Sequence, residues 1–146
     1  MAWNTQITMQ ANMTTQDIWS QYDGDLFYVN PSWTYLQIPN MSIVFDLAGT
    51  ASIYILFTCV AGVYPEPTEY AGVHFYFNID GIRLTEPWVY VGSYQGTSYL
   101  VDYSVALQHF IPSLSSGTHN ISVIVQSQET THYVRLCSLT IQSLAD

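Results

Sequence analysis

The fold of this chain is decided by residues 109–141, which read HFIPSLSSGTHNISVIVQSQETTHYVRLCSLTI. A Ser-Ser-Gly turn ends at Gly117, and residues 118–125 then alternate polar and apolar side chains. After a polar turn at 126–131, residues 133–141 alternate in the same way. Alternation with a period of two predicts half-buried β-strands. The stretch therefore predicts two long strands that pair as the last hairpin of an antiparallel sandwich.

The rest of the chain also predicts strands, and no segment sustains a helical period. Further strands are expected at 26–29, 33–38, 42–47, 51–61, 73–79, 82–84, 88–91 and 98–110. Asp80-Gly81, between two of them, is a strong signal for a tight hairpin turn. We therefore predict an all-β fold of about eight to ten strands over residues 26–146, which fits a single sandwich or barrel; the two closing strands favour a two-sheet antiparallel sandwich. Residues 1–25 are expected to form an extended N-terminal arm.

The composition limits the partners that this protein can have. Apolar residues make up 49% of the 146 residues, which is enough for a core. Eleven acidic residues face only two basic ones, for a net charge of −9, so binding to nucleic acid or to an anionic membrane surface is not expected. Only 9% of residues are charged, against a usual value of about 25%. Such a surface favours contact with identical copies.

The N-terminal residues show neither the basic nor the apolar region of a signal peptide, and no stretch reaches the roughly 18 apolar residues of a membrane span. We expect no membrane insertion, and a location on a virion surface or outside the cell.

Four segments stand in a telling order: IPNMSIV at 38–44, HFYFNIDG at 74–81, LSSGTHNISV at 114–123 and RLCSLTI at 135–141. This order resembles the jelly-roll domain of the tumour necrosis factor and complement globular-head type, especially as found in phage and other viral virion proteins. The resemblance covers about residues 33–142. It implies a ten-stranded jelly roll that forms a homotrimer through one sheet, shared by the strands that begin near 51, 99 and 133. The tyrosines that would line the trimer axis are Tyr54, Tyr99 and Tyr103; each also fits ordinary strand surface.

The two cysteines, Cys59 and Cys137, lie too far apart for a zinc knuckle or a CxxC pair. Both belong to apolar strand faces, so two buried thiols and a disulfide both remain open. The resemblance places them on neighbouring strands, which favours the disulfide.

Catalytic signatures are missing from the sequence. No nucleophile elbow, HExxH motif or phosphate loop occurs, and the histidines have no partners at metal-ligand spacing. We expect His119 to be a packed or hydrogen-bonded strand residue. The carboxylates that a glycosidase would need fall in loops or turns: Glu66, Glu69, Asp80 and Glu86. We predict that the protein is not an enzyme and needs no cofactor or metal.

Three functions fit these observations. The first is a structural protein of a virion or extracellular assembly, of the capsid-decoration, turret or fibre-head type, with itself and other capsid subunits as partners. The second is a module that binds cell-surface glycans for receptor attachment, on an aromatic platform of Trp33, Trp88, Tyr90 and Tyr94. The third is a filament subunit that donates its N-terminal arm as a strand.

Three Asn-x-Ser/Thr sequons occur in the sequence. They make three asparagines possible glycosylation sites: Asn12, Asn40 and Asn120.

Overall fold

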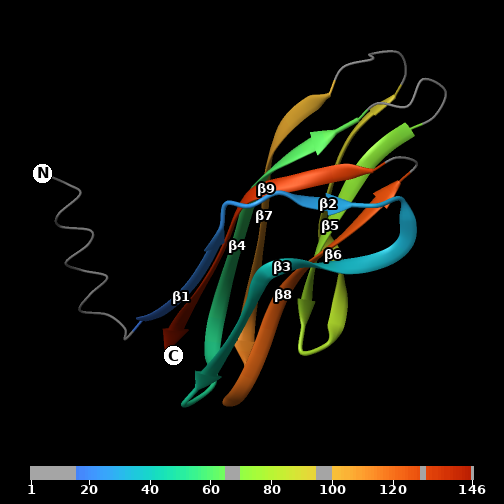
Figure 1. Cartoon of the computed structure of the whole chain (residues 1–146). Coiled ribbons are helices and arrows are strands. Elements are labelled where there is room, and N and C mark those ends of the chain that lie inside the picture. The colour runs from blue at the N-terminus through green and yellow to red at the C-terminus, as the bar shows by residue number, and fades with distance from the viewer. Residues whose placement is uncertain (1–15, 65–69, 95–99, 129–130, 146) are drawn as a thin grey trace, which may run out of the picture.

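The computed structural model describes residues 16–64, 70–94, 100–128 and 131–145, and within them nine β-strands form two layers (Figure 1). The strands are β1 (Gln16–Asp23), β2 (Phe27–Val29), β3 (Ser32–Leu47), β4 (Ala51–Val63), β5 (Tyr70–Ile79), β6 (Ile82–Tyr94), β7 (Val101–Leu114), β8 (Gly117–Gln128) and β9 (His132–Ala145). The short strand that the sequence hints at near residues 5–9 lies outside the described residues.

The strands form two antiparallel sheets. Sheet A has the order β1-β9-β4-β7, with β2 also paired to β9, and sheet B has the order β3-β8-β5-β6. The prediction of an all-β two-sheet sandwich is confirmed. The strands that the resemblance assigned to one sheet, here β4, β7 and β9, do share sheet A.

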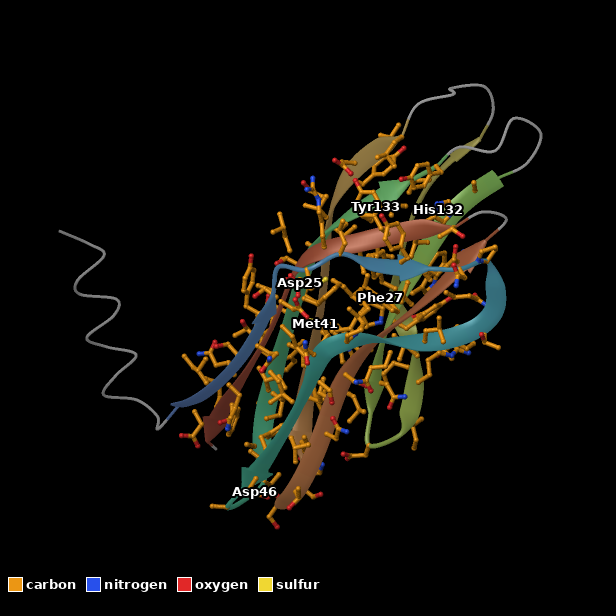
Figure 2. The ribbon with its side chains drawn as sticks, viewed as in Figure 1. Asp25, Phe27, Met41, Asp46, His132 and Tyr133 are labelled. Carbon is orange, nitrogen blue, oxygen red and sulfur yellow. The ribbon has the colours of Figure 1, made fainter. Side chains whose placement is uncertain are left out.

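The alternation seen in the sequence places the core between the layers. Every second side chain of β4 is buried, including the fully buried Ile55 and Phe57. Across the sandwich, β5 contributes Phe75, whose ring centroid lies 5.9 Å from that of Phe57. Met41, labelled in Figure 2, is also fully buried. Burying a side chain of this size contributes about 2 kcal/mol, so these contacts hold the sheets together.

The last two strands do not pair with each other. β8 lies in sheet B between β3 and β5, whereas β9 lies in sheet A between β1 and β4, so the expected closing hairpin is wrong. Alternation reveals that a segment is a strand with one buried face, but it does not reveal the partner. The chain instead passes from one sheet to the other after β8.

The predicted strand ends next to Pro39 and Pro87 are register irregularities inside longer strands. β3 runs through Pro39 and Asn40 with two register shifts, and Asn40 has a φ of 61°. β6 runs through Pro87, where residues 84–87 form a bulge, because Asn78 pairs with Arg83 and Tyr76 with Trp88. Proline is tolerated at bulges, where its missing N–H breaks no ladder bond.

Part of the expected N-terminal arm belongs to the sandwich. Residues 16–23 form β1, which pairs along its whole length with β9 of the same chain. The ring of Trp19 lies on the inner side, with its centroid 4.8 Å from that of Phe45. Residues 16–23 are therefore already paired within their own chain, which weakens the hypothesis that the arm is donated as a strand to a neighbouring subunit.

The hairpin predicted at Asp80-Gly81 is confirmed, and its aspartate is tied to β8. Both turn residues have positive φ, 51° and 84°, as a type I′ turn requires. Asp80 Oδ2 lies 2.7 Å from Nδ1 of His119, and Oδ1 accepts a hydrogen bond from the Asn120 N–H at 2.8 Å. Nε2 of His119 lies 2.8 Å from the carbonyl oxygen of Ser115. His119 is thus the hydrogen-bonded strand residue that its sequence context predicted.

These contacts shift both pKa values. The hydrogen bond to Asp80 is the main reason that the pKa of His119 is raised, and the hydrogen bond to His119 is the main reason that the pKa of Asp80 is lowered. Both ring nitrogens face acceptors, and only the imidazolium carries two N–H donors. The pair is therefore most favourable as carboxylate and imidazolium.

We predict that the coupling between Asp80 and His119 stabilises the fold most at mildly acidic pH. The lowered pKa of Asp80 gives a contribution that is present above about pH 3.9 and is lost as pH falls through the folded value. The raised pKa of His119 gives one that is fully present below about pH 6.5 and is lost as pH rises through the folded value. A double-mutant cycle with Asp80→Asn and His119→Gln, read by urea unfolding, should give about 1 kcal/mol at pH 5.5, a value discounted because Asp80 is 44% exposed.

The same cycle should give a smaller coupling at pH 8.5. A coupling that is equal at the two pH values, or larger at pH 8.5, would contradict the charged form of the pair.

Candidate assembly and binding surfaces

The outer face of sheet A has a broad area without charge that spans four strands, and the ion pair of Arg135, the cross-strand partner of Val60, with Asp102 borders this area at one end. The register fixes which side chains share this face, because cross-strand partners point the same way and β4 buries every other residue on the opposite side. We call this surface the uncharged face. It comprises Ile18, Ser20 and Tyr22 of β1, Ser138, Thr140, Gln142 and Leu144 of β9, Ser52, Tyr54, Leu56, Thr58 and Val60 of β4, and Ser104, Ala106, Gln108 and Phe110 of β7.

A β-bulge adds Leu136 to the uncharged face. Cys59 of β4 stands opposite two residues of β9, because its neighbours pair as Thr58 with Ser138 and Val60 with Arg135. Leu136 has a φ of 52° and is 44% exposed. A shallow depression of about 360 Å³ lies beside it, lined by Thr58, Cys59, Val60, Ser104, Val105, Ala106 and Leu136. An apolar side chain therefore projects from a strained backbone position next to a hollow.

The bulge also turns Cys137 inward toward Cys59. Both are buried free thiols, and their side chains are hydrogen bonded to each other. This bond and burial raise the pKa of Cys59, so its thiol stays protonated at neutral pH. The strands β4 and β9 are neighbours, as the resemblance implied. The disulfide itself stays a prediction.

The three tyrosines expected at a trimer axis do not gather in one place. Tyr54 lies on the uncharged face and donates a hydrogen bond to Gln108 Oε1 at 2.6 Å. Tyr103 points the other way, because its hydroxyl donates to the carbonyl oxygen of Gly92 in β6. Tyr99 lies outside the described residues.

Sheet B carries a row of aromatic rings on its outer face. His74 and Tyr76 face outward, and their cross-strand partners are Tyr90 and Trp88. The ring of His74 lies 5.6 Å from Trp88 and 4.5 Å from Tyr90. Trp88 is nevertheless 49% exposed. Two of the four expected platform residues, Trp88 and Tyr90, are thus brought together, while the side chains of Trp33 and Tyr94 lie outside the described residues.

Tyr90 lies flat on its own sheet. A Cβ atom added at Gly72 or Gly92 would come within 2.6 Å of its ring, so only glycine fits beneath it. Its position is therefore fixed by backbone contact.

Both arginines of the chain stack on tyrosine. Arg83 lies over Tyr35 and Tyr76, with 4.4 and 4.9 Å from its guanidinium carbon to the ring centroids. Arg135 lies 5.9 Å from the ring centroid of Tyr133, which is labelled in Figure 2, and forms an ion pair of 3.2 Å with Asp102. The hydroxyl of Tyr133 also donates to Asp102, and this bond is the main reason that its pKa is raised. Neither arginine was assigned a role from the sequence. Arg135 stands two residues after Tyr133 on the same strand, a spacing that could have indicated their contact, whereas the tyrosines beneath Arg83 lie on other strands.

A groove of about 690 Å³ lies where the edge strands of the two sheets, β6 and β7, contact each other. It contains aromatic, amide and carboxylate side chains and is lined by Tyr54, Glu86, Pro87, Trp88, Gln108, His109 and Phe110. Burial lowers the pKa of His109, so this side chain is neutral at neutral pH.

Two of the three sequons lie in the described residues, and both asparagines are exposed. Asn40 donates from Nδ2 to Asp23 Oδ2 at 2.7 Å, and this bond is the main reason that the pKa of Asp23 is lowered. Asn120 Oδ1 accepts a hydrogen bond from Ser42 Oγ at 2.8 Å. Asn12 lies outside the described residues. Glycosylation of all three stays a prediction.

Metal ligands do not cluster in the residues that the structure describes, where no group of three or more His, Cys, Asp or Glu side chains could hold an ion. Asp23 and Asp25 form the turn that their sequence predicted, with the Asp25 N–H donating to Asp23 Oδ1 at 2.9 Å. No helix in the described ranges is long and apolar enough to cross a membrane.

Comparison with known proteins identifies the fold and not the family. No family model matches the sequence, and no curated protein matches it. Eiger TNF from S. frugiperda is similar in structure, with a TM-score of 0.53 and 12% identity over 88% of this chain and 94% of that one. At this identity the likeness shows the fold alone, a two-sheet jelly-roll sandwich, which confirms the predicted fold.

Two other solved structures cover a similar share of this chain but little of their own length. Latent PorU from Porphyromonas gingivalis gives a TM-score of 0.51 and 14% identity over 86% of this chain and 13% of that one. Infectious bursal disease virus, Gx strain, gives a TM-score of 0.46 and 12% identity over 90% and 33%. This chain is thus similar to one part of each of those larger proteins.

The cysteine pair gives a prediction that chemistry can check directly. After exposure to oxidised glutathione, peptide mapping without reduction should recover Cys59 linked to Cys137, because the two thiols are already in contact. The bridge should stabilise the fold by about 4 kcal/mol, since it closes a long loop of the unfolded chain.

A Cys59→Ala variant serves as the control and should show no gain in stability on oxidation. Complete alkylation of both thiols in denaturant after the glutathione treatment would contradict the bridge.

Proposed function

We propose that this protein is a non-enzymatic structural component of a virion or extracellular assembly, and that it associates with itself as a trimer through the uncharged face. The observation that carries the proposal is this face: four adjacent strands present apolar and small polar side chains with no charge among them. Contiguous exposed apolar surface on a soluble protein marks an interaction site, and removal of such a surface from water costs no stripping of ion shells.

Leu136 supports self-association more specifically. A leucine in the left-handed region costs roughly 1–2 kcal/mol relative to a relaxed backbone. Glycine or asparagine would remove that cost, and the side chain of Leu136 does not contribute to the core of a single copy because it is exposed. Burial of this side chain against a second copy would offset the strain. Leu136 lies beside the depression of about 360 Å³ on the same face, so the Leu136 side chain of one copy could pack into the depression of another.

The trimeric state and the virion or extracellular location rest on the resemblance to tumour necrosis factor and virion jelly rolls. The small share of charged residues, 9% of the chain, is consistent with self-association, because few ion shells must be stripped when copies meet. The net charge of −9 opposes the association of identical copies, so contact is favoured at the uncharged face, where no like charges face each other. The strand-donation alternative has less support, since residues 16–23 are already paired within their own sheet.

Replacement of Leu136 by glycine should act in opposite directions on association and on folding. We expect trimer association to weaken at least tenfold, because burial of a leucine is worth about 2 kcal/mol. The stability of the isolated chain should stay the same or rise by up to about 1 kcal/mol, because glycine adopts positive φ without strain. Analytical ultracentrifugation measures association, and urea unfolding at low protein concentration measures stability.

Val44→Ala is the matched control, because Val44 is also an exposed apolar strand residue, 64% exposed, but lies in sheet B. It should leave association unchanged. A wild-type protein that stays monomeric at millimolar concentration would refute the proposal, and so would a Leu136→Gly variant that associates normally.

A further inference from the structure

The groove between β6 and β7 combines aromatic rings with hydrogen-bonding groups from both sheets. Sheet A contributes Tyr54, Gln108 and Phe110, and the β6 bulge contributes Glu86 and Trp88. Trp88 and Phe110 are 49% and 51% exposed, so large aromatic surfaces remain open to solvent. The volume of about 690 Å³ lies within the range of roughly 300–1,000 Å³ that is typical of small-molecule sites.

Neighbouring side chains hold these groups in place. The ring of Trp88 stacks on His74, with 5.6 Å between centroids and 26° between planes. The hydroxyl of Tyr54 donates to Gln108 Oε1, which fixes both side chains and leaves the amide N–H₂ of Gln108 for another acceptor. A site whose rings are already ordered loses less side-chain entropy when it binds a ligand.

This combination suits a sugar. One face of a pyranose ring presents C–H groups that pack on aromatic rings, while its hydroxyl groups need donors and acceptors around the rim. Trp88 and Phe110 offer the rings, the carboxylate of Glu86 accepts hydrogen bonds from hydroxyls, and the amide of Gln108 donates.

The charge of the groove selects among sugars. Glu86 brings a negative charge, no Lys or Arg is among the lining residues, and His109 is neutral at neutral pH because burial lowers its pKa. With a net charge of −9 on the whole chain, sialylated, uronic or sulfated glycans are repelled. The open shape, with rings spread along two strands, also differs from the closed aromatic cage that binds an ammonium group.

We propose that the groove between β6 and β7, lined by Trp88, Glu86, Gln108 and Phe110, is a binding site for uncharged glycans. Of the aromatic row on the outer face of sheet B, only Trp88 lines this groove, so the site lies at the edge of the sandwich and does not include Tyr90. The site goes beyond the proposed assembly function and does not depend on it. Tyr54, Gln108 and Phe110 belong to both the groove and the uncharged face, so a bound sugar would lie at the edge of the interface between copies and would compete with a neighbouring copy for these side chains.

The test is saturation-transfer NMR of the full chain with millimolar lactose, maltose, cellobiose and chitobiose, followed by titration of the sugar that responds. Trp88→Ala should weaken binding at least tenfold, because it removes the main stacking surface. Glu86→Gln should weaken it a few-fold, since an amide oxygen is a poorer acceptor than a carboxylate. Ile82→Ala is the matched control, because Ile82 is an exposed residue of β6, 70% exposed, that lies outside the groove.

Three results would overturn the proposal: saturation transfer to none of the four sugars, binding that Trp88→Ala leaves unchanged, or a preference for sialyllactose or tetramethylammonium over the neutral sugars. Sedimentation of Trp88→Ala separates this site from the assembly function. Its association should match that of wild type, because Trp88 is not part of the uncharged face. Lost glycan binding with normal association supports the groove, and loss of both assigns Trp88 to an interface between copies and overturns the glycan site.

Discussion

The carboxylate of Asp80 fixes the register of β5 against β8, on which the outer surface of sheet B depends. It contacts the ring of His119 and the backbone N–H of Asn120, while the Asp80 N–H donates to the Asn120 carbonyl oxygen at 2.8 Å. These bonds join the tip of the β5–β6 hairpin to the first residues of β8. A slip of one residue in β5 would exchange its two faces, which would send Phe75 and Phe77 to solvent and the outward-facing His74 and Tyr76 into the core. The turn-to-strand contact therefore decides where the aromatic rings lie.

This contact also explains why the Asp-Gly segment and the Gly-Thr-His-Asn segment occur together in the sequence. Each is a local signal: Asp80-Gly81 provides two residues at positive φ, and Gly117, with a φ of 124°, begins β8. Their side chains then meet across the sheet, about 40 positions apart in the sequence. Local alternation and turn chemistry were enough to predict the strands and an all-β sandwich, and the jelly-roll type was implied by the resemblance. They were not enough to predict that β8 and β9 belong to different sheets, because a period of two records a buried face and carries no information about the partner strand.

The residues of an outer surface could be predicted from the sequence only where they all lie on a single strand. Trp88 and Tyr90 were predicted as part of an aromatic platform, and because they stand two residues apart on one strand, they lie on the same face of sheet B. Tyr103 was assigned to the same surface as Tyr54, yet its parity within β7 turns it toward the opposite sheet. The groove lay beyond sequence reasoning for a different reason. Phe110 and Trp88 become neighbours only because β7 and β6 are the free edges of two stacked sheets, and the bulge at residues 84–87 depends on tertiary pairing that no local signal encodes.

The distribution of charge ties these surfaces together. The two arginines of the chain both lie over tyrosine rings at the outer faces of the sheets. Arg83 is on sheet B, and Arg135 lies beside Asp102 at one end of sheet A. Neither arginine lines the groove, and Arg135 stands at one end of the uncharged face, beside Val60, in an ion pair with Asp102. An anionic protein that keeps most of one sheet face free of charge can bring identical copies together there without placing like charges opposite each other. Because the chain has so few charged residues, the edge groove contains a single carboxylate among aromatic rings. An uncharged ligand with many hydroxyl groups can bind there without electrostatic repulsion from the negative charge of the protein.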